Sequence, residues 1–580
     1  MNRNLFSRLA AIVSSLAITV IISDHAQAGD SPPPNTSSGA VIDLQALVDA
    51  ALAKGEKTIV VPPGRHRVAP RNRECLSLRG VKDVRILCDG VEMICTETTR
   101  ALTIANCENV TVRGLSIDYD PLPFTQGRIV AISADKSVHD IELTDGYGSA
   151  DTANKFKYEI FNSETRTYRC GEYGIKTLER PDSKHLRITR INSSAKDPEQ
   201  VGDIIAIGSD SAPGGSIPHA VYVSESKKVR LEDISVYASN CFAFLEDNCD
   251  ATTYLRCRID RRPPADDLVP RAEARIRSLN ADAFHCICAA QGPEYLECSA
   301  RFMADDCINI CSDYHLITSS AGPVVRVLSK HRNGINVRIG DSVELLAYNG
   351  RRLPDAKVTS IEPDTGATEA ERQFISKQGM DAGTKEHLMR ASAFRITLDR
   401  TVELPIGSAL CPSSRKGNGF VVRKCDFGFN RSRGILVKAG DGIIEGNVLT
   451  GNVMSAIMVA PEWWWLESGC SDHLKIVNNT IRNCGDIAIA VFAFGGSPGI
   501  APAGTHSNIL VSGNAISDSP LPNILVTSTS GLELGRNTSQ SFDSKTAPEW
   551  TRYRFGLIDK QLKPVMTIRC DNVRGLEAGP

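Results

Sequence analysis

Short alternations of apolar and polar residues recur along most of this 580-residue chain, and each is broken by a small or polar residue before a second short alternation. Successive side chains of a strand point to opposite faces, so the pattern is typical of strands with one buried face. The segments begin at residues 82, 108, 227, 252, 293, 419, 441, 472, 507 and 531; DGIIEGNVLTGN (441–452) is an example.

The interruptions in the later repeats are equivalent in position. Asp426, Asn447, Asn479, Asn514 and Asn537 fall at the same corner of the pattern, and two of their spacings are 21 and 23 residues. Such spacings are typical of one coil of a parallel β-helix, in which stacked asparagines form a ladder between coils. We therefore predict an all-β fold, a right-handed parallel β-helix. The alternative is a β-sandwich whose segments resemble one another by chance.

Two stretches, 122–215 and 316–416, lack the repeat and instead contain patterns typical of antiparallel strands. We predict that each forms a small antiparallel β-barrel-like subdomain inserted into a coil loop, because surface insertions cost little stability. The β-helix then comprises residues 29–121, 216–315 and 417–580. An amphipathic helix over about residues 42–54 is predicted to cap its N-terminal end.

Residues 1–28 have the pattern of a cleaved export signal: two arginines, an apolar run over 9–22 and the small residues AQA at 26–28. This predicts a periplasmic or secreted protein; the alternative is an uncleaved membrane anchor. No other apolar run approaches the roughly 20 residues that span a bilayer, so no further membrane span is predicted.

Composition changes this picture little. The 66 basic and 68 acidic residues give a formal charge of −2, which argues against nucleic acid or an anionic membrane surface as partner. The 18 cysteines form no paired C-x-x-C set, which argues against a zinc ribbon. Many of them recur within the strand repeat, so we predict small buried side chains; the alternative is a disulfide framework. No cofactor or metal is predicted, and the oligomeric state stays open.

Three aspartates form the strongest candidate site. Asp282 lies in NADAFHC (280–286), and Asp305 and Asp306 lie in MADDCINI (303–310). The 23 residues from Asp282 to Asp305 correspond to one coil, which predicts that Asp282 stacks on one of the pair about 4.8 Å away. A bulge at the pair would turn both side chains outward. The alternatives are a calcium site or a capped turn.

Converging carboxylates suit the hydrolysis of a glycosidic bond. One carboxylic acid protonates the leaving oxygen, while a carboxylate activates water or attacks carbon. Crowding of like charges raises the pKa of one group, which then keeps its proton at neutral pH.

Three segments together resemble glycoside hydrolase family 110, over most of the chain and including the insertions. They are SIDYDPLPFTQGRI (116–129), NADAFHC followed by GPEYLECSARFMADDCINI (292–310), and WWLESGCSDHLKIVNNTIRN (464–483). The resemblance implies an exo-acting, inverting α-1,3-galactosidase that removes terminal galactose, including that of blood group B-type glycans. It places Asp282, Asp305 and Asp306 at the catalytic positions. By analogy with β-helical polygalacturonases, Asp305 is the predicted general acid, and Asp282 and Asp306 hold and activate water.

Further residues are candidates for carbohydrate binding, each with a structural alternative. Asp118 and Asp120 either bind hydroxyl groups or close a turn, and His285 either binds a hydroxyl or satisfies the backbone. Arg433 and Lys438 either contact substrate or are ordinary surface charges, and we favour the second interpretation. The full set of predicted substrate-binding residues is Asp118, Asp120, Glu246, His285, Asn309, which we expect to orient the acidic pair, and Trp463, Trp464 and Trp465 as a stacking platform.

Two other functions remain open at this point. A polygalacturonase-like hydrolase or uronate lyase on the same fold would need basic residues at the substrate carboxylate. A non-enzymatic glycan-binding β-helix would give the acidic trio only a structural role.

Overall fold

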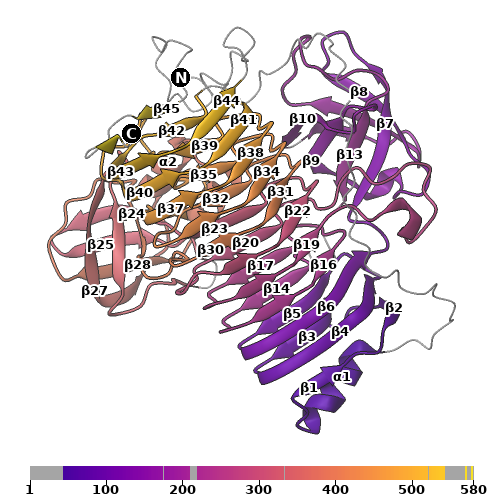
Figure 1. Ribbon diagram of the computed structural model, residues 1–580. Helices are drawn as coiled ribbons and strands as arrows, with labels where there is room; N and C mark the ends of the chain where they lie inside the picture. The colour runs from indigo at the N-terminus through magenta and orange to yellow at the C-terminus, as the bar shows by residue number, and fades with distance from the viewer. Residues whose placement is uncertain are drawn as a thin grey trace.

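The computed structural model describes residues 43–173, 175–209, 218–331, 334–519, 522–541, 568–570 and 577–578. Its strands stack into a right-handed parallel β-helix, as predicted, which runs diagonally in Figure 1 from α1 (Leu44–Ala53) to β45 (Ile568–Cys570). The predicted export signal, residues 1–28, lies outside the described residues. Among the described helices, none is long and apolar enough to cross a bilayer.

Each coil gives two short strands to one large sheet and a third strand to a second sheet. One coil consists of β33 (Ile443–Glu445), β34 (Val448–Thr450) and β35 (Ile457–Val459). These pair in parallel with β37 (Asp472–Val477), β38 (Thr480–Arg482) and β39 (Ile489–Val491) of the next coil.

The second sheet carries the candidate site. Its strands are β3 (Glu74–Arg79), β5 (Arg100–Ala105), β14 (Val221–Ser224), β17 (Phe244–Asp247), β20 (Phe284–Ile287), β23 (Ile308–Asp313), β32 (Ile435–Val437), β35, β39, β42 (Ile524–Val526) and β45, with β36 (Glu467–Ser468) paired antiparallel to β23.

One continuous apolar core fills the β-helix from Leu44 to Leu532. Leu44, Val48 and Ala51 of α1 belong to this core, so the helix closes the first coil as the apolar pattern predicted. The Asp43 side chain accepts a hydrogen bond from the Ala46 N–H and caps the helix. Burying the first coil in this way leaves no apolar end exposed to water.

A polar ladder runs along one corner of the coils. The Asn447 amide donates to Asn479 Oδ1 at 2.9 Å, Asn479 donates to Asn514 at 3.0 Å, and Asn514 donates to Asn537 at 2.9 Å. Asp426 was predicted to be part of the ladder, which is wrong by one residue: it pairs with Val448, and Cys425 stacks on Asn447.

Cysteines continue the same column in the earlier coils. Cys257, Cys298 and Cys425 lie in register, and each thiol contacts a backbone carbonyl of the preceding coil at 3.4 Å, as the asparagine amides do. The sixteen cysteines whose side chains the structure describes form no disulfide, and all of these except Cys241 are buried. Their recurrence in the sequence thus reflects packing and not a disulfide framework.

The first insertion forms an antiparallel sheet in the order β10-β9-β13-β7-β8-β12-β11. Within the described residues no pairing joins its edge strands β10 and β11, so it is an open sheet and not a closed barrel. Its strands are β7 (Phe124–Ile132), β8 (Val138–Leu143), β9 (Ala153–Phe161), β10 (Tyr168–Tyr173), β11 (Ile175–Glu179), β12 (His185–Arg190) and β13 (Ile204–Ser209).

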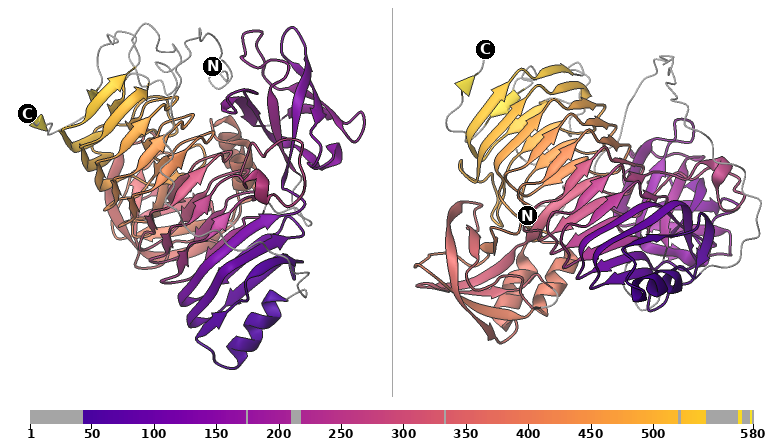
Figure 2. Two further views of the ribbon diagram at one scale, coloured as in Figure 1. Left: turned by 45° about the vertical axis from the view of Figure 1, so that its right-hand side comes forward. Right: turned by 60° about the horizontal axis from the view of Figure 1, so that its bottom comes forward.

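The second insertion is a closed antiparallel barrel in the order β24-β25-β28-β27-β26-β29. It also contains two helices that the strand pattern did not predict, α2 (Glu369–Lys377) and α3 (Ala382–Met389). The barrel strands are β24 (His315–Ala321), β25 (Val324–Leu328), β26 (Ser342–Leu346), β27 (Arg352–Asp364), β28 (Ala393–Leu398) and β29 (Ala409–Pro412). The two insertions project from different sides of the β-helix (Figures 1 and 2).

Candidate active site

The strand register brings the three aspartates together. β20 pairs with β23 so that Phe284 lies beside Ile308, an offset of 24 residues, and Asp306 therefore stacks on Asp282. The Asp306 N–H donates to Asp282 Oδ1 at 3.3 Å. One carboxylate oxygen from each of Asp282, Asp305 and Asp306 lies within 4.8 Å of the other two.

The acidic pair lies in the bend between β22 (Ser299–Arg301) and β23, and not within a strand. The expected bulge is therefore unnecessary, since a bend also frees adjacent side chains from strict alternation. Asp282 and Asp306 are 4 % and 2 % exposed, whereas the side chain of Asp305 is 20 % exposed. Asp305 is thus the member of the trio most open to a ligand.

Burial gives the trio unequal proton affinities. It raises the pKa of Asp306 to about 8, against the opposing charge of Arg433, whose Nη2 lies 2.9 Å from the carboxylate. Burial also raises the pKa of Asp282, against its 2.7 Å contact with His285 Nδ1. Burial disfavours the imidazolium of His285, but the Asp282 contact outweighs it and raises the pKa of His285. At neutral pH Asp306 is therefore neutral, and the contact between Asp282 and His285 favours the charged form of each partner against burial.

Two cations of the next coil, a mostly buried arginine and a fully buried lysine, lie beside the site. Ile308 pairs with Ile435, so residues after the second insertion stack directly on β23. The Arg433 backbone N–H donates to Asp306 Oδ1 at 2.7 Å. Lys438 is fully buried, with its ammonium 2.9 Å from Asn309 Oδ1. Interpreting Arg433 and Lys438 as ordinary surface charges was wrong.

Two glutamates that the sequence reasoning missed complete the site. Glu462 lies 3.3 Å from Arg433 and 3.1 Å from Lys438, and Glu467 lies 2.9 Å from Lys438. The Asn309 amide donates to Glu467 at 3.1 Å, so Asn309 links Lys438 and Glu467 and does not orient the acidic pair. The carboxylates balance the charge of the buried cations, which would otherwise be costly to desolvate.

Both insertions contribute to the walls of the site. Arg431 lies 3.1 Å from Asp305 and 3.5 Å from Glu159 of β9, which connects the first insertion to the acidic trio. Lys330, which follows β25 of the second insertion, contacts the backbone oxygen of Trp465.

The three tryptophans have different environments. Trp463 is 6 % exposed, and its indole N–H donates to Gly407 O at 3.1 Å while its ring packs edge-on against Tyr348. It therefore packs the second insertion against the β-helix and offers no face to a sugar. Trp464 and Trp465 are 37 % and 38 % exposed and retain the stacking surface that was predicted for the group.

Three predicted ligands lie outside the site. Asp118 is buried in a bidentate 2.9 Å pair with Arg275, and Asp120 is paired with Arg67 on the large sheet. Glu246 faces the core of the β-helix, where it accepts a hydrogen bond from Tyr254 and where burial raises its pKa. Asp118 and Glu246 are buried structural residues and Asp120 forms a surface ion pair, so the assignment of the three to substrate binding was wrong.

The comparisons with known proteins agree with the fold and point to one class of enzyme. A family model described as a right handed beta helix region matches residues 411–539. Alpha-1,3-galactosidase A of Bacteroides fragilis is 21 % identical over 90 % of this chain and 88 % of its own. Alpha-1,3-galactosidase B of Bacteroides thetaiotaomicron is 23 % identical over 82 % of this chain and 78 % of its own.

Among solved structures, the catalytic domain of a GH87 alpha-1,3-glucanase in complex with nigerose has a TM-score of 0.38 and 11 % identity, covering 95 % of this chain and 70 % of that chain. An endo-xylogalacturonan hydrolase from Aspergillus tubingensis has a TM-score of 0.38 and 9 % identity, covering 93 % of this chain and 99 % of that chain.

The missed residues share one cause. Arg433 and Lys438 follow β23 by one coil in space but by 127 residues in sequence, because the second insertion lies between them. Glu462 lies in the loop after β35 and Glu467 begins β36, so both lie beyond the repeat pattern. The one available signal was the segment at 462–467, in which two glutamates flank three rings that were expected to bind sugar.

Proposed function

We propose that this protein is a glycoside hydrolase that removes terminal α-1,3-linked galactose from glycans such as blood group B-type structures, in the manner of family 110. The observation that carries the proposal is the convergence of three carboxylates within 4.8 Å beside two buried cations. Relatives named alpha-1,3-galactosidase align with it over most of their length. Their names support both the proposed bond, an α-1,3 linkage, and the proposed sugar, galactose. We also propose that residues 1–28 direct its export.

Asp305 is the proposed general acid. Its side chain is the most exposed of the trio, so it can reach the oxygen between galactose and the leaving sugar. A general acid must hold its proton at neutral pH, and an ionised carboxylate nearby favours that form.

Asp282 is the proposed base, and Asp306 holds the water beside it. The contact with His285 favours the ionised form of Asp282 against its burial, whereas Asp306 keeps its proton up to a pKa of about 8. One water between them can donate a hydrogen bond to Asp282 and accept one from the Asp306 hydroxyl. These two hydrogen bonds orient the remaining lone pair of the water oxygen toward the sugar. His285 stabilises the charge on Asp282 before the reaction and can share the proton that Asp282 receives.

Galactose hydroxyl groups are the proposed partners of the neighbouring charged residues. Arg433, Lys438 and Glu467 present donors and acceptors next to the trio, and charged partners strengthen hydrogen bonds to neutral hydroxyls. Both cations are already paired with carboxylates, which leaves no excess positive charge for a uronate. This disfavours the polygalacturonase-like and lyase alternatives.

The substrate and the stereochemistry are tested together. Incubation of the full chain with an α-1,3-galactosyl oligosaccharide should release free galactose, and proton NMR of the first turnovers should show the β-anomer. Carboxyl gaps of about 6.5–9.5 Å are usual for inversion and about 5–5.5 Å for retention, so the anomer formed first reports which arrangement the bound substrate meets. Initial α-galactose would overturn inversion, an unsaturated product from a uronan would favour the lyase, and binding without release would favour a glycan-binding protein.

The choice of general acid has its own test. Asp305→Asn should reduce hydrolysis of the natural disaccharide by about 100-fold or more but reduce hydrolysis of nitrophenyl α-galactoside far less, because nitrophenolate leaves without a proton. The same selective loss in Asp306→Asn, with equal loss on both substrates in Asp305→Asn, would assign the acid to Asp306 instead.

A further inference from the structure

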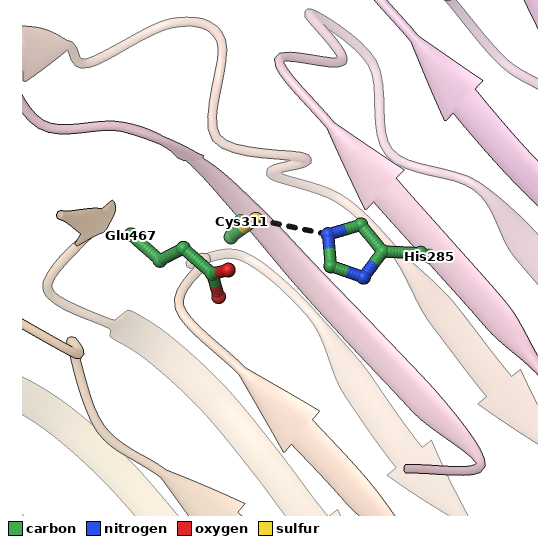
Figure 3. Close-up of side chains that lie close together, drawn as sticks. All are labelled: His285, Cys311 and Glu467. Carbon is green, nitrogen blue, oxygen red and sulfur yellow. Dashed lines mark hydrogen bonds between the residues drawn. The ribbon is translucent and has the colours of Figure 1, made fainter. Parts of the chain in front are cut away.

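A second group of side chains converges just beyond the acidic trio. His285, Cys311 and Glu467 come from β20, β23 and β36, and Figure 3 shows all three directed toward one point. One ligand atom from each residue lies within 4.8 Å of the other two, and Cys311 Sγ lies 3.8 Å from His285 Nε2. Ligand atoms around a tetrahedral zinc ion lie about 3.5 Å apart, so only small side-chain shifts separate this group from a metal site.

The Asp282 contact orients His285 for coordination. Asp282 Oδ2 lies 2.7 Å from Nδ1, and a carboxylate there accepts a hydrogen bond from the N–H of that nitrogen. The lone pair of the neutral ring is then on Nε2, which faces Cys311 and Glu467. Histidines that bind metals in proteins almost always donate their other N–H to a carboxylate or carbonyl in this way.

We propose that His285, Cys311 and Glu467 bind a borderline-soft divalent metal ion of the Zn²⁺ type. The donor set of imidazole, thiolate and carboxylate favours Zn²⁺ over Mg²⁺ and Ca²⁺, which take oxygen ligands. Binding replaces the Cys311 S–H bond by a bond to the metal, and that proton passes to solvent, together with the Nε2 proton when the ring is charged.

The charges around His285, Cys311 and Glu467 allow a metal ion to replace the released proton. Lys438 opposes a cation, because its ammonium lies 2.9 Å from Glu467. Lys438 also contacts Glu462 at 3.1 Å and Asn309 at 2.9 Å, so it keeps two partners when Glu467 turns one oxygen to the metal. Asp282, on the other side of His285, adds negative charge.

The consequence for activity depends on the proposed function. A metal on Nε2 prevents His285 from taking up charge and fixes the ring that holds the proposed base, Asp282. We therefore expect the ion to act as a reversible inhibitor of hydrolysis and not as a cofactor.

The binding test needs no substrate. Titration of the purified full chain with Co²⁺ should give, at one equivalent, a near-ultraviolet thiolate-to-cobalt absorption that Zn²⁺ abolishes. Cys311→Ser should lose this absorption. The matched variant Cys241→Ser changes a cysteine that is not buried, and it should keep the absorption. No thiolate absorption in the wild type, or an unchanged one in Cys311→Ser, would overturn the site. Cys311→Ala replaces Cys311→Ser if circular dichroism shows that the serine variant is misfolded.

A second experiment tests inhibition by Zn²⁺ and is independent of the binding test. Zn²⁺ should inhibit galactose release by the wild type, and Cys311→Ser should need at least about 10-fold more Zn²⁺ for the same inhibition while its rate without metal is unchanged. Equal inhibition of both proteins would overturn the link to Cys311. If neither protein releases galactose, the proposed function fails, and the cobalt absorption still decides the metal site.

Discussion

Asp282→Asn should lower kcat/KM for an α-1,3-galactoside by about 1,000-fold at pH 7, which is within the range for loss of a general base. Asparagine keeps the shape and still accepts from the Asp306 N–H, but it cannot take a proton from water. It also removes the negative charge that raises the pKa of His285. Initial rates of galactose release, with thermal unfolding to confirm the fold, measure the effect.

Asp120→Asn is the matched control, because it makes the same chemical change at a surface aspartate paired with Arg67. It should keep wild-type activity within a factor of about two, since surface ion pairs contribute little. A folded Asp282→Asn protein with more than about a tenth of wild-type activity would contradict the role of Asp282 as base.

The pH profile of the same series tests the role of Asp306. Its pKa of about 8 means that it is neutral below pH 8 and charged above. Because the neutral form holds the water, the wild-type rate should fall as the pH rises through about 8. Asp306→Asn is neutral at every pH, so its lower rate should lack this fall. A fall at the same pH in Asp306→Asn would assign the ionisation to another group.

Asn479→Ala should lower the free energy of unfolding by roughly 3 kcal/mol. Its side chain accepts from the Asn447 N–H and amide and donates to Ile444 O and Asn514 Oδ1, at 2.9–3.0 Å. Alanine would leave these buried groups without partners in two neighbouring coils.

Chemical denaturation followed by circular dichroism measures this loss. Asn508→Gly is the matched control, because Asn508 is exposed and has the positive φ of 53° that glycine adopts freely. It should change the free energy of unfolding by less than about 1 kcal/mol. Equal effects of the two changes would show that water replaces the ladder contacts without cost.

The fold could be predicted from the sequence because a β-helix repeats its strand pattern at every coil, and Asn447, Asn479 and Asn514 mark that repeat directly. The acidic trio could be found for the same reason, although the real offset is 24 residues, which places Asp306 and not Asp305 on Asp282.

Burial direction could not be predicted. Strand alternation gives two faces without saying which one is the interior, and the misplacement of Glu246 followed from this. Trp463 was misplaced because its partner, Tyr348, belongs to the second insertion. Arg433 and Lys438 were misinterpreted because an insertion places them far along the sequence from the coil that they contact.

That separation also sets an order of assembly during synthesis. A ribosome makes the three acids of the site before residue 307, but Arg433 and Lys438 follow only after the whole second insertion has been made. A nascent chain that ends after Asp306 and before Arg433 has the acids without their counter-charges. Its carboxyl groups must therefore stay hydrated or protonated. The partly made protein is therefore inactive, and the site is completed by the coil that closes over β23 after the barrel.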